Sequence, residues 1–373
     1  MRKTTVQCSE WAAPGVWRVI APKEIANQWR DDLRFLVLLD DDKDQEAVDA
    51  LHRRGLPNIA WLKTAGCKPG DVVALTQSRK AIVLIRDGDR HHSLQLTNRC
   101  NSYCLMCSQP PTTHNDDWMV EEAMEVIRHM KASPAVLGFS GGEPTLLREK
   151  LRNVIDWVAI HHPTTELEVL TNARLLKDFP LCKILSEGSP PVSWLVPIYG
   201  HADFLHDFVV QSPGAFEDTL QGILNLQALR QPIQLRIVLI PQVLNILPEL
   251  ALFIGRNLPF VREVALMACE SIGFALANRE QCETDLTNWW PALMSSGRIL
   301  QRHAVPFLFM NTPLCALPEE LRPHAHKSIS DWKNVYMDDC SVCTAQPDCS
   351  GFFSWHERGW KPTKKIKVIQ EAL

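Results

Sequence analysis

The sequence has little net charge and no long apolar run. Its 373 residues carry a formal net charge of −4, which gives no electrostatic reason to expect a nucleic-acid partner. No apolar run approaches the roughly 20 residues that a membrane-spanning helix needs, and the first residues, MRKTTVQCSEWAAPG, lack the apolar segment of a signal peptide. We therefore expect a cytoplasmic protein that binds neither nucleic acid nor membrane.

Cysteine, in contrast, is plentiful, with 12 in the chain. In a reducing compartment, metal or cluster ligation explains such a number better than disulfides do. Two groups stand out by position: Cys100, Cys104 and Cys107, and then Cys315, Cys340, Cys343 and Cys349. The remaining cysteines are scattered, and we interpret them as structural: Cys8, Cys67, Cys182, Cys269 and Cys282.

The first cysteine group lies in the segment LTNRCNSYCLMCSQPP, with the spacing C-x3-C-x2-C. A [4Fe-4S] cluster usually takes four cysteines, so a cluster bound by three keeps one iron open for an outside ligand. A zinc site favours paired C-x2-C units with four ligands, and buried apolar cysteines are rarely found in threes. The spacing therefore predicts an iron–sulfur cluster on Cys100, Cys104 and Cys107.

The hydrophobic pattern divides the chain into three parts. Residues 1–92 form a small N-terminal α+β unit of unknown role, with strands at 34–40 and within 71–88 and a helix at 44–55. Residues 93–311 alternate strands and helices, which predicts an α/β core with a parallel sheet. Residues 312–373 form a Cys-rich extension organised by a metal centre. The core strands are expected at 93–97, 135–139, 167–171, 194–199, 233–240 and 262–268, with helices at 120–131 and 147–162.

Two further motifs follow predicted core strands. In FSGGEPTLL, residues 139–147, the glycines allow the backbone to approach a ligand closely. Glu143 places a carboxylate there that is suited to an ammonium group. The next strand ends in LTNAR, where Thr171 and Asn172 offer hydrogen bonds to a cofactor.

The cysteine spacing and these motifs, in this order, resemble the radical S-adenosylmethionine (radical SAM) family. The resemblance implies that SAM fills the open iron through its amino and carboxylate groups, and that an electron from the [4Fe-4S] cluster cleaves it to a 5'-deoxyadenosyl radical. It also implies a partial (β/α)6 barrel with the chemistry at the carboxyl ends of the strands. The implied SAM contacts come from Ser140, Gly141, Gly142, Glu143, Pro144, Thr171 and Asn172.

The chain departs from the family pattern at two places. Ala173 stands where relatives often have glycine, so a positive φ there would be strained. Pro197 stands where many relatives have a serine that contacts SAM. We expect Tyr199 or Arg236 to supply that contact, and a structural salt bridge is the alternative role of Arg236.

The strand that contains Pro197 is followed by HADFLHDF, which offers a candidate acid–base pair. His206 and Asp207 are adjacent in this segment. We favour the other interpretation, in which they hold the loop and cap the next helix.

The second cysteine group suits either a second [4Fe-4S] cluster or structural zinc. Radical SAM enzymes that modify peptides commonly carry auxiliary clusters in C-terminal extensions, and this resemblance favours iron–sulfur. Such a cluster either relays electrons or ligates substrate. The proposed ligands are Cys315, Cys340, Cys343 and Cys349.

The segments LMCSQPP and SISDWKN make residues 93–353 similar to the C-type radical SAM maturase of the His-Xaa-Ser system. The resemblance implies hydrogen abstraction from a ribosomally made precursor peptide with His-Xaa-Ser repeats, followed by a cross-link. It also implies a second radical SAM subunit in a heterodimer and an electron donor. Two alternatives stay open: a radical SAM enzyme of a small metabolite, and a cluster-bearing partner subunit without catalysis.

Overall fold

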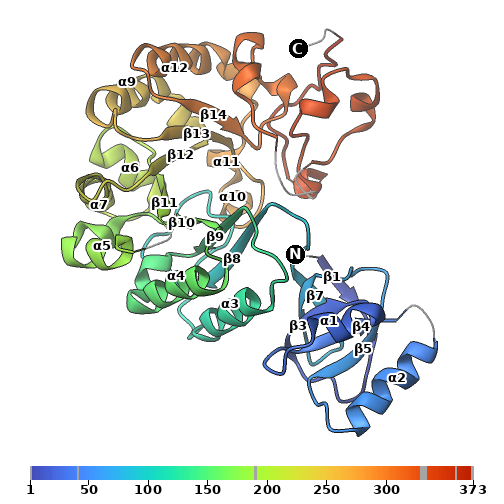
Figure 1. Ribbon diagram of the computed structural model, residues 1–373. Coiled ribbons are helices and arrows are strands. Elements are labelled where there is room, and N and C mark those ends of the chain that lie inside the picture. Colours follow the sequence, from blue (N-terminus) through green and yellow to red (C-terminus); the bar gives the residue numbers. More distant parts are fainter. Residues whose placement is uncertain (1, 40–41, 189–190, 328–333, 358, 371–373) are drawn as a thin grey trace.

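The computed structural model describes residues 2–39, 42–188, 191–327, 334–357 and 359–370. It contains two seven-stranded sheets and a C-terminal extension (Figure 1). Most of the segment SISDWKN, residues 328–333, lies outside the described residues. No helix within these ranges is long and apolar enough to span a membrane.

The first residues of the chain form both edge strands of the N-terminal sheet. Its strand order is β1-β7-β6-β3-β4-β5-β2. The strands β1 and β2 follow each other along the chain, yet β1 pairs with β7 and β2 pairs with β5 at the opposite end of the order. The elements are β1 Arg2–Thr5, β2 Gln7–Cys8, β3 Gly15–Ile20, α1 Ile25–Gln28, β4 Phe35–Leu38, α2 Asp42–Arg53, β5 Ile59–Lys63, β6 Val72–Leu75 and β7 Lys80–Ile85.

The second sheet is a partial barrel of parallel strands in chain order, β8 to β14. Its edge strands are β8 and β14. The α/β fold is thus confirmed, and six of these strands match the predicted ones. The sheet has one strand more than the six expected, the four-residue strand β14. The strands are β8 His91–Thr97, β9 Val136–Gly141, β10 Glu166–Leu170, β11 Val192–Pro197, β12 Ile233–Leu239, β13 Glu263–Ala268 and β14 Phe307–Met310.

Helices cover the outer face of this sheet (Figure 1). The pattern of β12 explains why helices cover this face. Its residues alternate between buried apolar side chains and half-buried ones that include Gln234 and Arg236. One face packs against helices and the other faces the interior of the barrel. The helices are α3 Trp118–His129, α4 Glu149–His161, α5 Phe179–Ser186, α6 Asp203–Val210, α7 Ala215–Ala228, α8 Pro241–Leu244, α9 Leu247–Asn257, α10 Phe274–Ala277, α11 Arg279–Cys282 and α12 Trp290–Arg302.

The N-terminal unit is joined to the barrel at the end of α3. The buried Arg18 donates to His129 O at 2.6 Å and to Met130 O at 2.9 Å. These carbonyls end a helix, where a positive charge is stabilising. His129 Nε2 accepts the backbone N–H of Arg34 at 3.1 Å. Both contacts fix the N-terminal sheet against the first helix of the barrel.

The C-terminal extension has only short 3-10 turns and isolated bridges in its described part. Its tail packs back on the barrel, because Trp360 is buried in the main hydrophobic cluster. Leu286 N–H donates to Pro362 O at 2.9 Å. The extension therefore lies against the barrel near α11 and α12.

Candidate functional site

The predicted site residues that follow β8, β9, β10 and β11 meet at one edge of the barrel, since parallel strands end on the same side. The cysteine loop begins directly after β8. Burial raises the pKa of Cys100 to about 11 and that of Cys104 to about 12, and neighbouring acidic groups add to both shifts. For Cys104 these neighbours include Cys107 and Cys100. The thiols therefore lie close together, and metal binding would release their protons.

The glycines of the FSGGEP motif pack against the stem of the cysteine loop. Gly141 has φ +147°, and a Cβ there would collide with Thr97 O. A Cβ on Gly142 would collide with Arg99 O. Gly142 N–H donates to Thr97 O and Glu143 N–H donates to Arg99 O, both at 2.8 Å. The close approach that these glycines allow is between two segments of the chain.

Glu143 is fully buried, and its carboxylate joins its own segment to the segment that follows β10. Oε1 accepts from Thr145 N at 3.0 Å, from Thr145 Oγ1 at 2.5 Å and from Thr171 Oγ1 at 2.6 Å. Oε2 accepts from Asn172 N at 2.6 Å. Burial raises the pKa of Glu143, and the donors from Thr145, Thr171 and Asn172 oppose that shift by stabilising the ionised form.

Asn172 connects Glu143 to the cysteine loop. Its side-chain amide donates to Asn101 Oδ1 at 2.6 Å and lies 4.0 Å from Cys100 Sγ. Arg174, which sequence reasoning missed, donates from Nη1 to Asn101 O at 2.5 Å. The LTNAR motif contains Arg174 and was the available signal. Both side chains hold the first turn of the loop.

Ala173 adopts the left-handed conformation, with φ 60° and ψ 2°. The positive φ that would be strained for a residue other than glycine is therefore present at this alanine. A Cβ on Gly222 of α7 would collide with Ala173 O. Close packing of α7 holds the strained residue in place.

Arg236 lies on β12, and Tyr199 lies just beyond the end of the neighbouring strand β11. Tyr199 is buried, and burial raises its pKa well above the usual value, with the acidic thiols of Cys104 and Cys107 adding to the shift. Arg236 Nε donates to Gln234 Oε1 at 2.9 Å. Burial lowers the pKa of Arg236, and Glu168 and Tyr199 oppose this. Tyr199 therefore lies near both the thiols of the cysteine loop and Arg236.

A hollow of about 570 Å³, open in part to solvent, lies beside Tyr199. Phe204 and Phe208 of α6 line it together with Gln242. Within the described residues, Gln242 Oε1 is buried without a hydrogen-bond partner. The hollow therefore has aromatic walls and a free acceptor.

His206 and Asp207 make the contacts of a loop support. His206 Nδ1 accepts Tyr199 N–H at 3.2 Å. Asp207 accepts from Gly214 N at 2.6 Å and from Phe216 N at 2.8 Å, where α7 begins. These contacts favour capping over an acid–base role.

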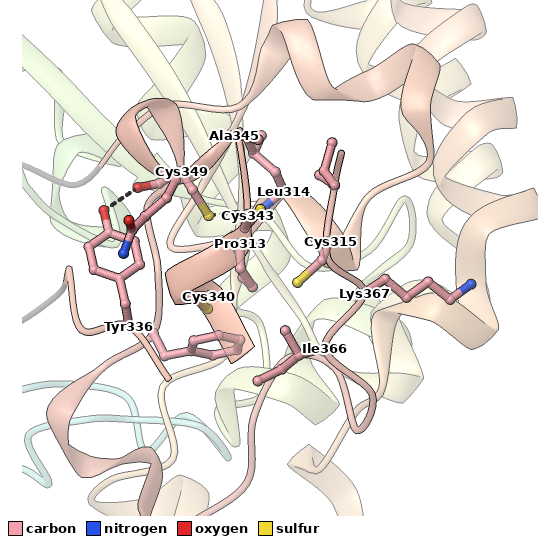
Figure 2. Close-up of a pocket in the computed structure, with 13 residues that line it drawn as sticks. Pro313, Leu314, Cys315, Tyr336, Cys340, Cys343, Ala345, Cys349, Ile366 and Lys367 are labelled. Atoms are coloured by element: carbon pink, nitrogen blue, oxygen red, sulfur yellow. Dashed lines mark hydrogen bonds between the residues drawn. The ribbon is translucent and has the colours of Figure 1, made fainter. Parts of the chain in front are cut away.

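The four C-terminal cysteines line one cavity (Figure 2). Apolar side chains such as Leu314, Phe352 and Ile366 line the rest of it. Cys349 Sγ accepts from Leu314 N at 3.4 Å and from Gly351 N at 3.3 Å. Burial raises the pKa of Cys315 to about 11. This is a thiol-rich cavity with backbone donors on one sulfur.

In the described part of the chain, no three Cys, His, Asp or Glu side chains are arranged to hold a single metal ion. In a [4Fe-4S] cube each cysteine binds a different iron, so cluster ligands are spaced more widely than the ligands of one ion. Both cysteine groups are candidates for cluster ligation.

Comparison with known proteins gives a family match for the barrel. Residues 94–254 match the radical SAM superfamily model. This range, which is less than half of the chain, is therefore similar to the core domain of radical SAM enzymes. The matched range contains the cysteine loop, the glycine motif and LTNAR.

Individual relatives are distant. An uncharacterized protein of Methanocaldococcus jannaschii, MJ0907, is 24% identical over 201 residues, which cover 53% of this chain and 66% of that protein. Streptococcus suis SuiB bound to S-adenosylmethionine is 13% identical with a TM-score of 0.48, covering 59% of this chain and 50% of SuiB. A radical SAM methyltransferase from Sphaerobacter thermophilus is 14% identical with a TM-score of 0.44, and the match covers 64% of this chain and 68% of the methyltransferase. The chain thus spans about half the length of SuiB.

Proposed function

We propose that this chain, which carries a radical SAM domain over residues 94–254, is a maturase that abstracts hydrogen from a ribosomally made peptide. The observation that carries the proposal is the connection of the three-cysteine loop to the buried carboxylate of Glu143 through Asn172. A [4Fe-4S] cluster on Cys100, Cys104 and Cys107 keeps one iron open. When bound, it supplies the electron for reductive cleavage of SAM.

The chain's own residues are suited to SAM at this edge of the barrel. Glu143 Oε2 accepts one described hydrogen bond, and an ionised carboxylate oxygen accepts about two. The SAM ammonium takes the second position. Thr171 keeps Oε1 in place. Arg236 on β12, or Tyr199 just beyond the end of β11, supplies the contact to the SAM carboxylate.

We assign the cavity that the four C-terminal cysteines line to a second [4Fe-4S] cluster, with zinc as the alternative. The support is the number of thiols around it and the two N–H donors to Cys349 Sγ. Such donors stabilise a thiolate and influence the potential of a cluster. The ligands are Cys315, Cys340, Cys343 and Cys349.

The substrate is a precursor peptide with His-Xaa-Ser repeats, and the product is a cross-link through a His or Ser side chain. The support is the sequence of LMCSQPP and SISDWKN, which the cluster chemistry does not itself require. The 5'-deoxyadenosyl radical takes one hydrogen atom from an unactivated carbon and leaves as 5'-deoxyadenosine. The carbon then bonds to the His or Ser side chain, which loses a proton, and the second cluster accepts the remaining electron. The partners are a second radical SAM subunit and an electron donor.

Anaerobic reconstitution tests the cofactor part. We expect about eight irons per chain, since each cube takes four, and about four irons plus one zinc would instead indicate a structural tail. We also expect an electron paramagnetic resonance (EPR) spectrum that changes on addition of SAM, and 5'-deoxyadenosine as product. Cys104→Ala should abolish both, whereas Cys182→Ala, a buried core cysteine, should keep them. A chain that leaves SAM intact would contradict the proposal.

The peptide part needs a separate experiment. Reconstituted enzyme, partner subunit and reductant are incubated with a precursor peptide that contains His-Xaa-Ser repeats. The expected result is a peptide mass reduced by the lost hydrogen atoms. An unchanged mass, under conditions where SAM is cleaved, would reject the cross-link.

A further inference from the structure

The shape of the cysteine loop has to come from contacts, because residues 98–117 contain no helix or strand. Arg174 holds its first turn. In the middle, Tyr103 N–H donates to Val210 O at 3.0 Å and Leu105 N–H donates to Val209 O at 2.9 Å. The last turn, which carries Cys107, needs a support of its own.

That support is the segment of residues 273–282, which contains α10 and α11. Phe274 N–H donates to Cys107 O at 2.8 Å. Asn278 Nδ2 donates to Leu105 O at 2.9 Å, and the thiol of Cys282 donates to the same oxygen at 3.7 Å. Three donors of this short segment therefore fix two carbonyl groups in the last turn of the loop.

Gly273 brings the segment this close. Its φ is +59°, in the left-handed region that side chains rarely adopt. A Cβ there would collide with Cys107 O and would lie 2.6 Å from Ser108 O. Glycine is thus needed both for its conformation and for the approach of two backbones.

The C-terminal extension anchors both flanks of the segment. Ser271 lies against Gly359, where an added Cβ would collide with it. On the other flank, Leu286 N–H donates to Pro362 O at 2.9 Å, and Asp285 Oδ2 accepts from Lys364 N at 3.3 Å. The segment is consequently a fixed support.

We propose that residues 273–282 are a positioning element that sets the direction of the Cys104 and Cys107 thiols, and thereby the geometry of the open iron. The inference rests on the proposed function, because it concerns the same cluster. Its physical basis is that turning the peptide planes at Leu105 or Cys107 turns the attached side chains. A [4Fe-4S] cube accepts its thiolates only in a narrow range of directions.

Two variants of the full chain, each with a matched control, test the inference. Asn278→Ala removes the donor to Leu105 O, and its control is Asn257→Ala, whose amide donates to Phe253 O at 2.9 Å on α9. Gly273→Ala is compared with Gly214→Ala, which has a similar φ of +74° and nothing within 4 Å of the added methyl. Circular dichroism and thermal unfolding of the iron-free proteins establish that each variant folds.

The decisive measurement is the SAM-dependent change in the EPR spectrum, because only a cluster with an open iron responds to SAM. We expect Asn278→Ala to weaken SAM affinity roughly fivefold, the equivalent of one net hydrogen bond, and Gly273→Ala to lose the response. Both controls should behave like the wild type.

If both variants respond to SAM as their controls do, the positioning role is wrong while the proposed function stands. If the wild type itself shows no SAM response, the proposed function fails and the inference fails with it. Should Gly273→Ala not fold, Asn278→Ala alone decides between these outcomes.

Discussion

The buried carboxylate of Glu143 leads to a specific prediction for Glu143→Gln. The best placement of the amide keeps its oxygen at the Oε1 position, where Thr145 and Thr171 donate. Its NH2 group then faces the backbone N–H of Asn172, so one charge-assisted hydrogen bond is lost and two donors oppose each other. Such a bond is worth about 1.5–3 kcal/mol and a buried unpaired donor costs about 1–3 kcal/mol. Removing a buried charge offsets part of this, so we expect a net loss of about 2 kcal/mol.

Urea unfolding of the iron-free protein measures this loss, and EPR titration measures SAM binding. Asp71→Asn is the matched control, because Asp71 is also buried and accepts from the backbone N–H groups of Lys68 and Asp87. Asp71→Asn should lower stability and keep the SAM response, whereas Glu143→Gln should lower both. A Glu143→Gln protein as stable as the wild type would refute the hydrogen-bond argument, and one with a full SAM response would refute the ammonium role.

Three further changes test the junction between the N-terminal sheet and α3 and the packing beside Ala173. Burial lowers the pKa of His129 from 6.5 to about 4, so the stability contributed by the neutral imidazole is complete above pH 6.5 and is lost as the pH falls toward 4. Between pH 7.5 and 5, the free energy of unfolding of the wild type should fall by about 2 kcal/mol more than that of His129→Gln, as measured by urea unfolding. Gly222→Ala, which in a helix normally stabilises by about 1 kcal/mol, should instead destabilise by about 2 kcal/mol because the methyl group collides with Ala173 O; a raised melting temperature would contradict the packing. Arg18→Ala should lower the free energy of unfolding by about 3 kcal/mol, because two charge-assisted hydrogen bonds to the end of α3 are lost. An unchanged midpoint of urea unfolding would contradict this prediction.

The regular part of the barrel could be predicted from hydrophobic pattern. The strand β12 has buried apolar residues at every second of its seven positions, and the predicted range, 233–240, nearly matches it. The strand β14, FLFM, is too short for a periodic signal. In the N-terminal sheet, β1 and β2 were not predicted, because their pairing with β7 and β5 depends on strands distant in the sequence.

The location of the candidate site in the fold was predictable where its residues belong to short motifs. The cysteines of the loop and Glu143 belong to short motifs, and the structure places both at the carboxyl ends of neighbouring strands. Asn278 could not be predicted, because its bond to Leu105 joins residues 173 positions apart. An Asn in a polar segment has no sequence feature that distinguishes such a contact from solvent exposure.

The glycines of the SGGEP motif illustrate how a correct motif can carry a second physical reason. Sequence reasoning assigned Gly141 and Gly142 to close approach of a ligand. In the structure their missing Cβ atoms leave room for the carbonyl oxygens of Thr97 and Arg99, which lie in the stem of the cysteine loop. Glu143 and the first part of the cysteine loop are thereby joined through backbone hydrogen bonds. These two residues allow the close approach of the segment that carries Glu143 to the stem of the cysteine loop, so we expect the proposed SAM binding and cluster binding to depend on the same backbone contact.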